Sequence, residues 1–67
     1  MQITLNNRPE TFDEEEMTVS ELLLIKNFTF RMLVIKVNGE VVKKEQRDTT
    51  IIKDGDDVAV IHLISGG

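Results

Sequence analysis

Residues 58–67 read Val-Ala-Val-Ile-His-Leu-Ile-Ser-Gly-Gly. The first seven have the apolar, β-branched composition of a strand, and three small residues follow them. Apolar side chains occupy both alternating faces of this strand: Val58, Val60 and Ile64 on one, and Ala59, Ile61 and Leu63 on the other. A sheet packed against a single helix is covered on one face, so the second set needs a different environment.

Two explanations of this second set are open. The strand is central in its sheet and simply rich in β-branched residues, or its outward side chains form a docking patch. We favour the patch because the strand leads directly into Gly66 and Gly67. Val58 and Val60 are then expected to meet the helix alongside Ile3 and Ile35.

A hairpin precedes this strand in the middle of the chain. Leu33, Ile35 and Val37 have strand spacing and lead into Asn38-Gly39, a strong signal for a two-residue turn, before a return strand over 40–42. Residues 43–50 are polar and are interpreted as a loop or short helical turn. A brief extended segment is expected over 49–52, and Asp-Gly-Asp at 54–56 is predicted to turn tightly.

The N-terminal third predicts a second hairpin and the helix. Residues 1–5 alternate apolar and polar side chains, residues 6–9 turn the chain, and a short return strand is expected over 10–12. The acidic run 13–16 is interpreted as a solvated segment that complements a helix dipole. Thr18 and Glu21 fit a capping box, so a helix is expected to begin near Val19 and to place Leu22 in the core.

These elements predict an α+β domain in which one main helix packs across a mixed sheet of four to five strands. A chain of 67 residues accommodates one such domain, over 1–67, with a flexible tail at 65–67. The phenylalanines and methionines are expected in the core.

Composition excludes several classes of protein. The net charge of −4 argues against binding to a phosphate backbone and is compatible with a partner that has a basic face. There is no cysteine, and the single histidine, His62, lacks neighbours at ligand spacing, so we expect no metal site and no role for His62 in catalysis.

The apolar runs are too short to cross a bilayer and the N-terminus does not resemble a signal peptide. We therefore expect a cytoplasmic protein that is monomeric when free and does not contact membrane. Lys43, Lys44 and Lys53 are interpreted as solvated lysines, with contact to an acidic partner as the alternative.

The terminal glycines permit a specific chemistry. Without Cβ atoms, Gly66 and Gly67 can thread a narrow channel and deliver an α-carboxylate to another protein's active site. There the carboxylate can attack the α-phosphorus of ATP, and the resulting acyl-adenylate can react with a sulfur nucleophile to give a thiocarboxylate.

Five stretches together resemble the ThiS family: the N-terminal MQITLNNRPETF, the capping-box helix, VNGEVV at 37–42, KDGDD at 53–57 and ISGG at 64–67. The resemblance covers essentially the whole chain. It implies a ubiquitin-like β-grasp fold whose first and last strands lie side by side and parallel at the centre of the sheet.

The resemblance also implies a sulfur carrier for the thiazole ring of thiamine, a protein cosubstrate with no bound cofactor. A ThiF-like enzyme would use ATP and a sulfur donor to convert Gly67 to an acyl-adenylate and then a thiocarboxylate, for delivery to a ThiG-like thiazole synthase. Gly66 matches the penultimate glycine of the family, whereas Ser65 replaces a more usual alanine or glycine. Ile61, Leu63 and Ile64 would contact the partner enzymes.

Three alternatives stay open. A MoaD-like carrier for molybdopterin would use the same tail, although such carriers are usually longer. A ubiquitin-like modifier would transfer activated Gly67 to a lysine of a target protein. A plain β-grasp interaction domain would carry a chemically idle tail.

Overall fold

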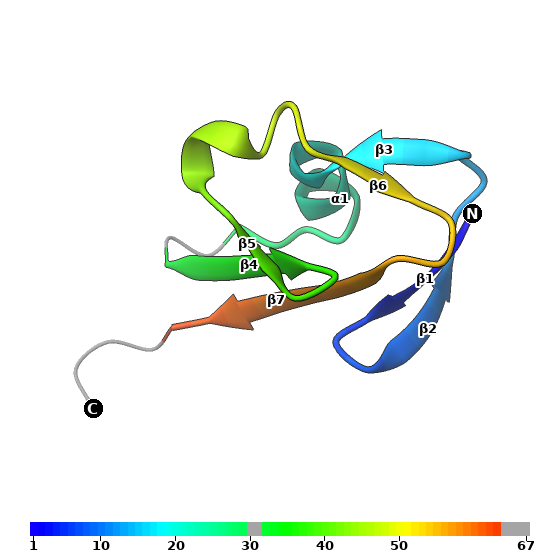
Figure 1. Cartoon of the computed structure of the whole chain (residues 1–67), viewed down its shortest axis with the longest axis horizontal. Helices are drawn as coiled ribbons and strands as arrows, with labels where there is room; N and C mark the ends of the chain where they lie inside the picture. Colours follow the sequence, from blue (N-terminus) through cyan, green and yellow to red (C-terminus); the bar gives the residue numbers. More distant parts are fainter. Residues whose placement is uncertain (30–31, 64–67) are drawn as a thin grey trace.

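The computed structural model describes residues 1–29 and 32–63. Along the chain lie β1 (Gln2–Leu5), β2 (Arg8–Thr11), β3 (Glu16–Thr18), α1 (Val19–Ile25), β4 (Leu33–Val37), β5 (Glu40–Val42), the 3-10 helix η1 (Lys44–Gln46), β6 (Ile51–Lys53) and β7 (Asp57–His62). Five strands form one sheet in the order β2-β1-β7-β4-β5, with α1 on one side of it (Figure 1). The predicted α+β fold with one helix and a mixed sheet is confirmed.

β7 occupies the centre of this sheet. It pairs parallel with β1, through Leu5 opposite Val58, and antiparallel with β4 along five residue pairs. The expected parallel pairing of the first and last strands is therefore correct. β7 is thus paired on one edge with β1 at its start, over 57–58, and on the other edge with β4 over 58–62. It runs away from the end of the molecule where the N-terminus lies (Figure 1).

The first hairpin turns earlier than predicted. Asn6 and Asn7 have φ of 51° and 67°, so the turn contains these two residues and β2 already begins at Arg8. The expected turn over 6–9 and the strand over 10–12 are thus wrong at their boundary. Pro9 lies inside β2 on the edge of the sheet. The Phe12 amide donates to the Met1 carbonyl at 2.8 Å, and the antiparallel alternation then directs the Pro9 nitrogen away from β1, where no donor is needed.

The segment before the helix forms a strand that was not predicted. β3 pairs antiparallel with β6, with Met17 opposite Ile52. Residues 13–16 are exposed as expected, but Glu16 belongs to β3, and the acidic residue in the first turn of α1 is Glu21. The extended segment expected over 49–52 lies at Ile51–Lys53.

The helix is capped at both ends by side-chain and backbone hydrogen bonds. The Glu21 amide donates to Thr18 Oγ1 at 3.1 Å, and the Thr18 amide donates to Glu21 Oε1 at 2.9 Å, so the predicted capping box is present. At the other end Asn27 adopts φ 58°, and the Phe28 amide donates to the Leu23 carbonyl at 2.8 Å. This pattern is a Schellman motif, with asparagine in the position that glycine usually occupies.

The second hairpin matches its prediction and is joined to the turn before β7. Asn38 and Gly39 have φ of 52° and 84°, which define the two-residue turn. Asn38 Nδ2 donates to Asp56 Oδ1 at 3.0 Å, while the Asp57 amide donates to Asn38 Oδ1 at 2.9 Å. The predicted short helical turn between 43 and 50 is η1.

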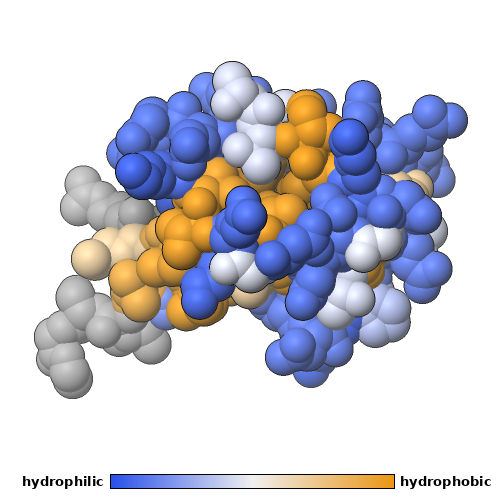
Figure 2. All heavy atoms as spheres, in the orientation of Figure 1, coloured by the Kyte–Doolittle hydropathy of each residue, from blue (hydrophilic) through white to orange (hydrophobic). Residues whose placement is uncertain are grey.

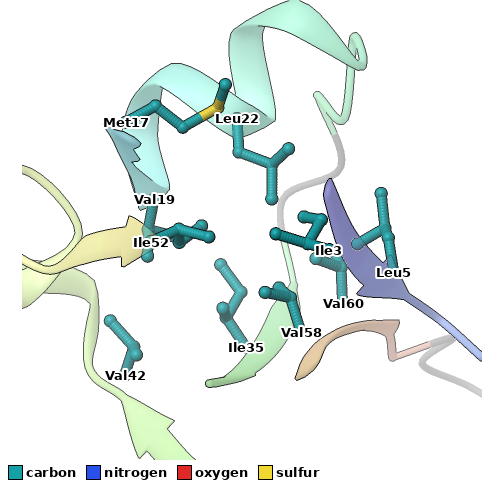
Figure 3. Packing of buried hydrophobic residues seen from close by; sticks show 10 residues of the cluster. All are labelled: Ile3, Leu5, Met17, Val19, Leu22, Ile35, Val42, Ile52, Val58 and Val60. Carbon is teal, nitrogen blue, oxygen red and sulfur yellow. The ribbon is translucent and has the colours of Figure 1, made fainter. Parts of the chain in front are cut away.

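The hydrophobic core lies between the sheet and the layer formed by α1, β3 and β6 (Figure 3). Its buried residues are Ile3, Leu5, Met17, Val19, Leu22, Ile35, Val42, Ile52, Val58 and Val60. Val58 and Val60 meet Ile3 and Ile35 on the helix side, as predicted. No helix within 1–29 and 32–63 has the length and apolar character needed to cross a membrane.

Candidate functional site

The candidate site begins where β7 ends. β7 was predicted to reach Ile64, but its last residue is His62, and Leu63 continues beyond it. The Leu63 amide still donates to the Met32 carbonyl at 2.9 Å, so the position of Leu63 is coupled to the start of β4. Ile64, Ser65, Gly66 and Gly67, together with the expected flexible tail, lie outside the described residues.

The outward side chains of this region face away from the core. Ile61 and Leu63 are each 44% exposed, whereas Ala59 is half-buried. The central position of β7 is confirmed, and its outward face presents accessible apolar side chains, whereas their role as a docking patch stays a prediction. His62 is exposed and pairs with Leu33 at the end of the strand.

Strand pairing extends this apolar surface onto β4 and β5. Val34 of β4 pairs with Ile61 of β7. Lys36 of β4 pairs with Ala59 of β7 and with Val41 of β5. Directly paired residues share a face of an antiparallel sheet, so Val34 and Val41 point outward with Ile61. We call the set Met32, Val34, Val41, Ile61 and Leu63 the outer patch.

Two members of the outer patch are notably accessible. Val41 is 58% exposed and Met32 is 50% exposed, so the expectation that every methionine belongs to the core is wrong for Met32. In Figure 2, hydrophobic atoms gather over the region of β4 and β5, and hydrophilic atoms dominate around β1 to β3. The outer patch is therefore one accessible apolar region of the molecule, and α1 carries others at Leu24 and Ile25, which are 79% and 50% exposed.

Sequence reasoning identified Ile61 and Leu63 but missed Met32, Val34 and Val41. The available signal was the unbroken apolar run over residues 32–35, in which the outward residue Val34 separates the inward residues Leu33 and Ile35. As in β7, apolar residues on both faces of β4 indicate that its outward face is apolar too.

This arrangement suits presentation of the chain that follows Leu63. The end of β7 has a defined position because Ile61 and His62 pair with β4, and Gly66 and Gly67 carry no side chain that would block a narrow channel. The outer patch beside Leu63 offers apolar surface for a protein that receives this chain. The described residues thus place accessible apolar side chains beside Leu63, from which the sequence continues to Gly66 and Gly67.

Comparisons with known proteins agree with this description. The family model described as the ThiS family matches residues 3–67. The crystal structure of a thiamine biosynthesis protein (ThiS) from Geobacter metallireducens is 36% identical over 100% of both chains, with a TM-score of 0.90. A solution structure of a thiamine biosynthesis protein from the same organism is 35% identical, covers 100% of this chain and 88% of that one, and has a TM-score of 0.77. Because the family model matches nearly the whole chain and a ThiS protein shares its fold at 36% identity, this chain belongs to the ThiS family.

Proposed function

We propose that this protein carries sulfur for thiamine biosynthesis, as the substrate of an adenylating enzyme and then of a thiazole synthase. The observation that carries the proposal is the fixed central strand β7, which ends beside an accessible apolar patch and is followed by Ser65, Gly66 and Gly67. Membership of the ThiS family supports the same role.

The reactive group is the α-carboxylate of Gly67. One carboxylate oxygen attacks the α-phosphorus of ATP within a ThiF-like enzyme, pyrophosphate leaves, and a mixed anhydride with AMP forms. Hydrosulfide delivered by a sulfur donor then attacks the acyl carbon, the bond to AMP breaks, and loss of the thiol proton gives the Gly67 thiocarboxylate. The fold contributes presentation to this chemistry, whereas the partner enzyme holds ATP and stabilises the transition states.

The partner enzymes dock on the outer patch. Ile61 and Leu63 supply accessible apolar area next to the reactive chain, and Ile64 and Ser65 continue the contact toward Gly66. The adenylating enzyme and a ThiG-like thiazole synthase bind in turn, because the same carboxyl group must be activated before its sulfur is transferred. We place these steps in the cytoplasm.

Intact mass spectrometry tests the proposal directly. The protein is incubated with a ThiF-like enzyme, ATP and a sulfur donor, and a mass gain of roughly 16 Da is expected for the exchange of one oxygen for sulfur. A chain that lacks Gly67 is the control and should gain nothing.

Other outcomes distinguish the alternatives. Isopeptide links between Gly67 and lysines of many proteins would favour a ubiquitin-like modifier. An unchanged mass in the presence of an enzyme that modifies another carrier would contradict the proposal and favour an interaction domain with an idle tail.

A further inference from the structure

A group of cations borders the outer patch. A hollow of about 320 Å³ lies at the end of the sheet, and it is lined by Lys43, Lys44 and Arg47 together with apolar residues that include Met32, Val41 and Leu63. No carboxylate lines this hollow in the part of the chain that the structure describes. Lys36 adds a fourth positive charge on the outward face, next to Val41.

None of these four side chains forms a salt bridge within the described ranges 1–29 and 32–63. The salt bridge found there joins Lys26 to Glu10 and lies elsewhere, between α1 and β2. Glu45 follows Lys44 in η1 but is exposed and does not line the hollow. Arg47 is held in place because its Nη2 donates to the Leu33 carbonyl at 3.2 Å. The apolar patch is therefore bordered by a positive rim formed by Lys36, Lys43, Lys44 and Arg47.

The charge beside the outer patch is positive, although the net charge of the chain is negative. The net charge of −4 was compatible with a partner that has a basic face. The acidic run at residues 13–16 is on the loop before β3 and in β3 itself, which pairs with β6 and not with the five-stranded sheet. At the end of the molecule from which the reactive chain continues, the lining charges are positive.

We infer that the adenylating enzyme receives this protein on a surface whose centre is apolar and whose edge bears carboxylates opposite Lys36, Lys43, Lys44 and Arg47. The inference rests on the proposed function and specifies the chemistry of its partner. A central apolar contact supplies most of the affinity, while complementary charges at the edge raise the rate of association and select the partner. The long-range part of this attraction is screened by salt.

A pair of double variants tests the inference. Lys43→Gln with Lys44→Gln removes two charges from the rim, and Arg8→Gln with Lys53→Gln removes two charges from exposed positions on β2 and β6. Both pairs change the net charge equally and affect exposed side chains, so circular dichroism and thermal unfolding should match the wild type. KM for the carrier in adenylation by a ThiF-like enzyme is measured by ATP–pyrophosphate exchange at low and high salt.

The rim variant should raise KM roughly 3- to 10-fold at low salt, and the difference should shrink at about 0.5 M salt, whereas the control pair stays near the wild type. Equal effects of the two pairs would overturn the inference and leave the proposed function intact. An effect on KM for ATP in place of KM for the carrier would also overturn it, because the cations would then face the nucleotide. Failure of the wild-type protein to be adenylated by an enzyme active on another carrier would reject the proposed function and the inference together.

Discussion

Asparagines set the backbone direction at three turns of this protein. Asn6 and Asn7 close the first hairpin, Asn38 begins the second, and Asn27 ends the helix, all with positive φ. Asparagine tolerates this left-handed region better than most residues with a side chain, because its short polar group can hydrogen-bond locally. Asn38 additionally bonds Asp56 and the Asp57 amide, so one residue both shapes a hairpin and attaches it to the strand that carries the site.

A single hydroxyl at Thr18 should have a measurable effect on stability. Thr18→Ala removes the acceptor for the Glu21 amide and should lower the free energy of unfolding by about 1 kcal/mol. Thr18→Ser keeps the acceptor and is the matched control. Urea unfolding followed by circular dichroism gives both values, and an equal loss in the two variants would show that β3 pairing, and not the cap, depends on Thr18.

At the level of elements, the strands and the helix are too short to be stable alone. α1 has seven residues, and β3, β5 and β6 have three each. An isolated helix of this length or an isolated hairpin is marginal in water. These elements persist because each places at least one residue in the shared core, such as Met17 from β3, Leu22 from α1 and Ile52 from β6.

Two adjacent residues of β5 allow the stability contributions of the core and of the outer patch to be compared. Val42 is 7% exposed and Val41 is 58% exposed. Val42→Ala should cost about 2 kcal/mol of stability through lost burial and the cavity left behind, whereas Val41→Ala should stay within about 0.5 kcal/mol of the wild type. Thermal unfolding of the two variants measures the difference, and comparable losses would contradict the assignment of Val41 to the outward face.

At the scale of the whole molecule, the hydrogen-bonded turns and the outer patch lie at different ends of the sheet. The β1–β7 pair and the linked turns at 38–39 and 54–56 stabilise one end, where Gly55 donates its amide to the Gln2 carbonyl at 2.8 Å. The other end presents the outer patch, its positive rim and the start of the reactive chain. Docking can therefore involve the second end without disturbing the hydrogen bonds that hold the first.

Two isoleucines of similar exposure test this division. Ile61 is 44% exposed on β7 within the outer patch, and Ile51 is 40% exposed on β6, outside it. Ile61→Glu should raise KM for adenylation by about 10-fold or more, because it places a carboxylate in the apolar centre of the interface, whereas Ile51→Glu should change KM less than about twofold. Both variants must first show native circular dichroism. Similar KM values for the two would indicate that the enzyme binds a different surface.

Sequence alone determined the features that depend on local chemistry or strict alternation. The Asn38-Gly39 turn, the Thr18–Glu21 capping box and the strands around Ile35 and Val60 were predicted correctly, because each signal is contained in a few consecutive residues. The accessibility of Ile61 and Leu63 also followed from the doubly apolar strand, whereas their contact with a partner stays a prediction.

Tertiary structure decided what depends on pairing between distant segments. β3 is a three-residue strand in which no period is detectable, so its existence follows from the register that joins Met17 to Ile52. The same pairing places the extended segment expected over 49–52 at β6. The outer patch also required pairing, because the outward face of Val34 and Val41 is set by their partners in the neighbouring strands. The positive rim forms in an acidic chain for the same reason: net charge is a sum over residues, whereas the field at a docking surface depends on which residues the fold brings together.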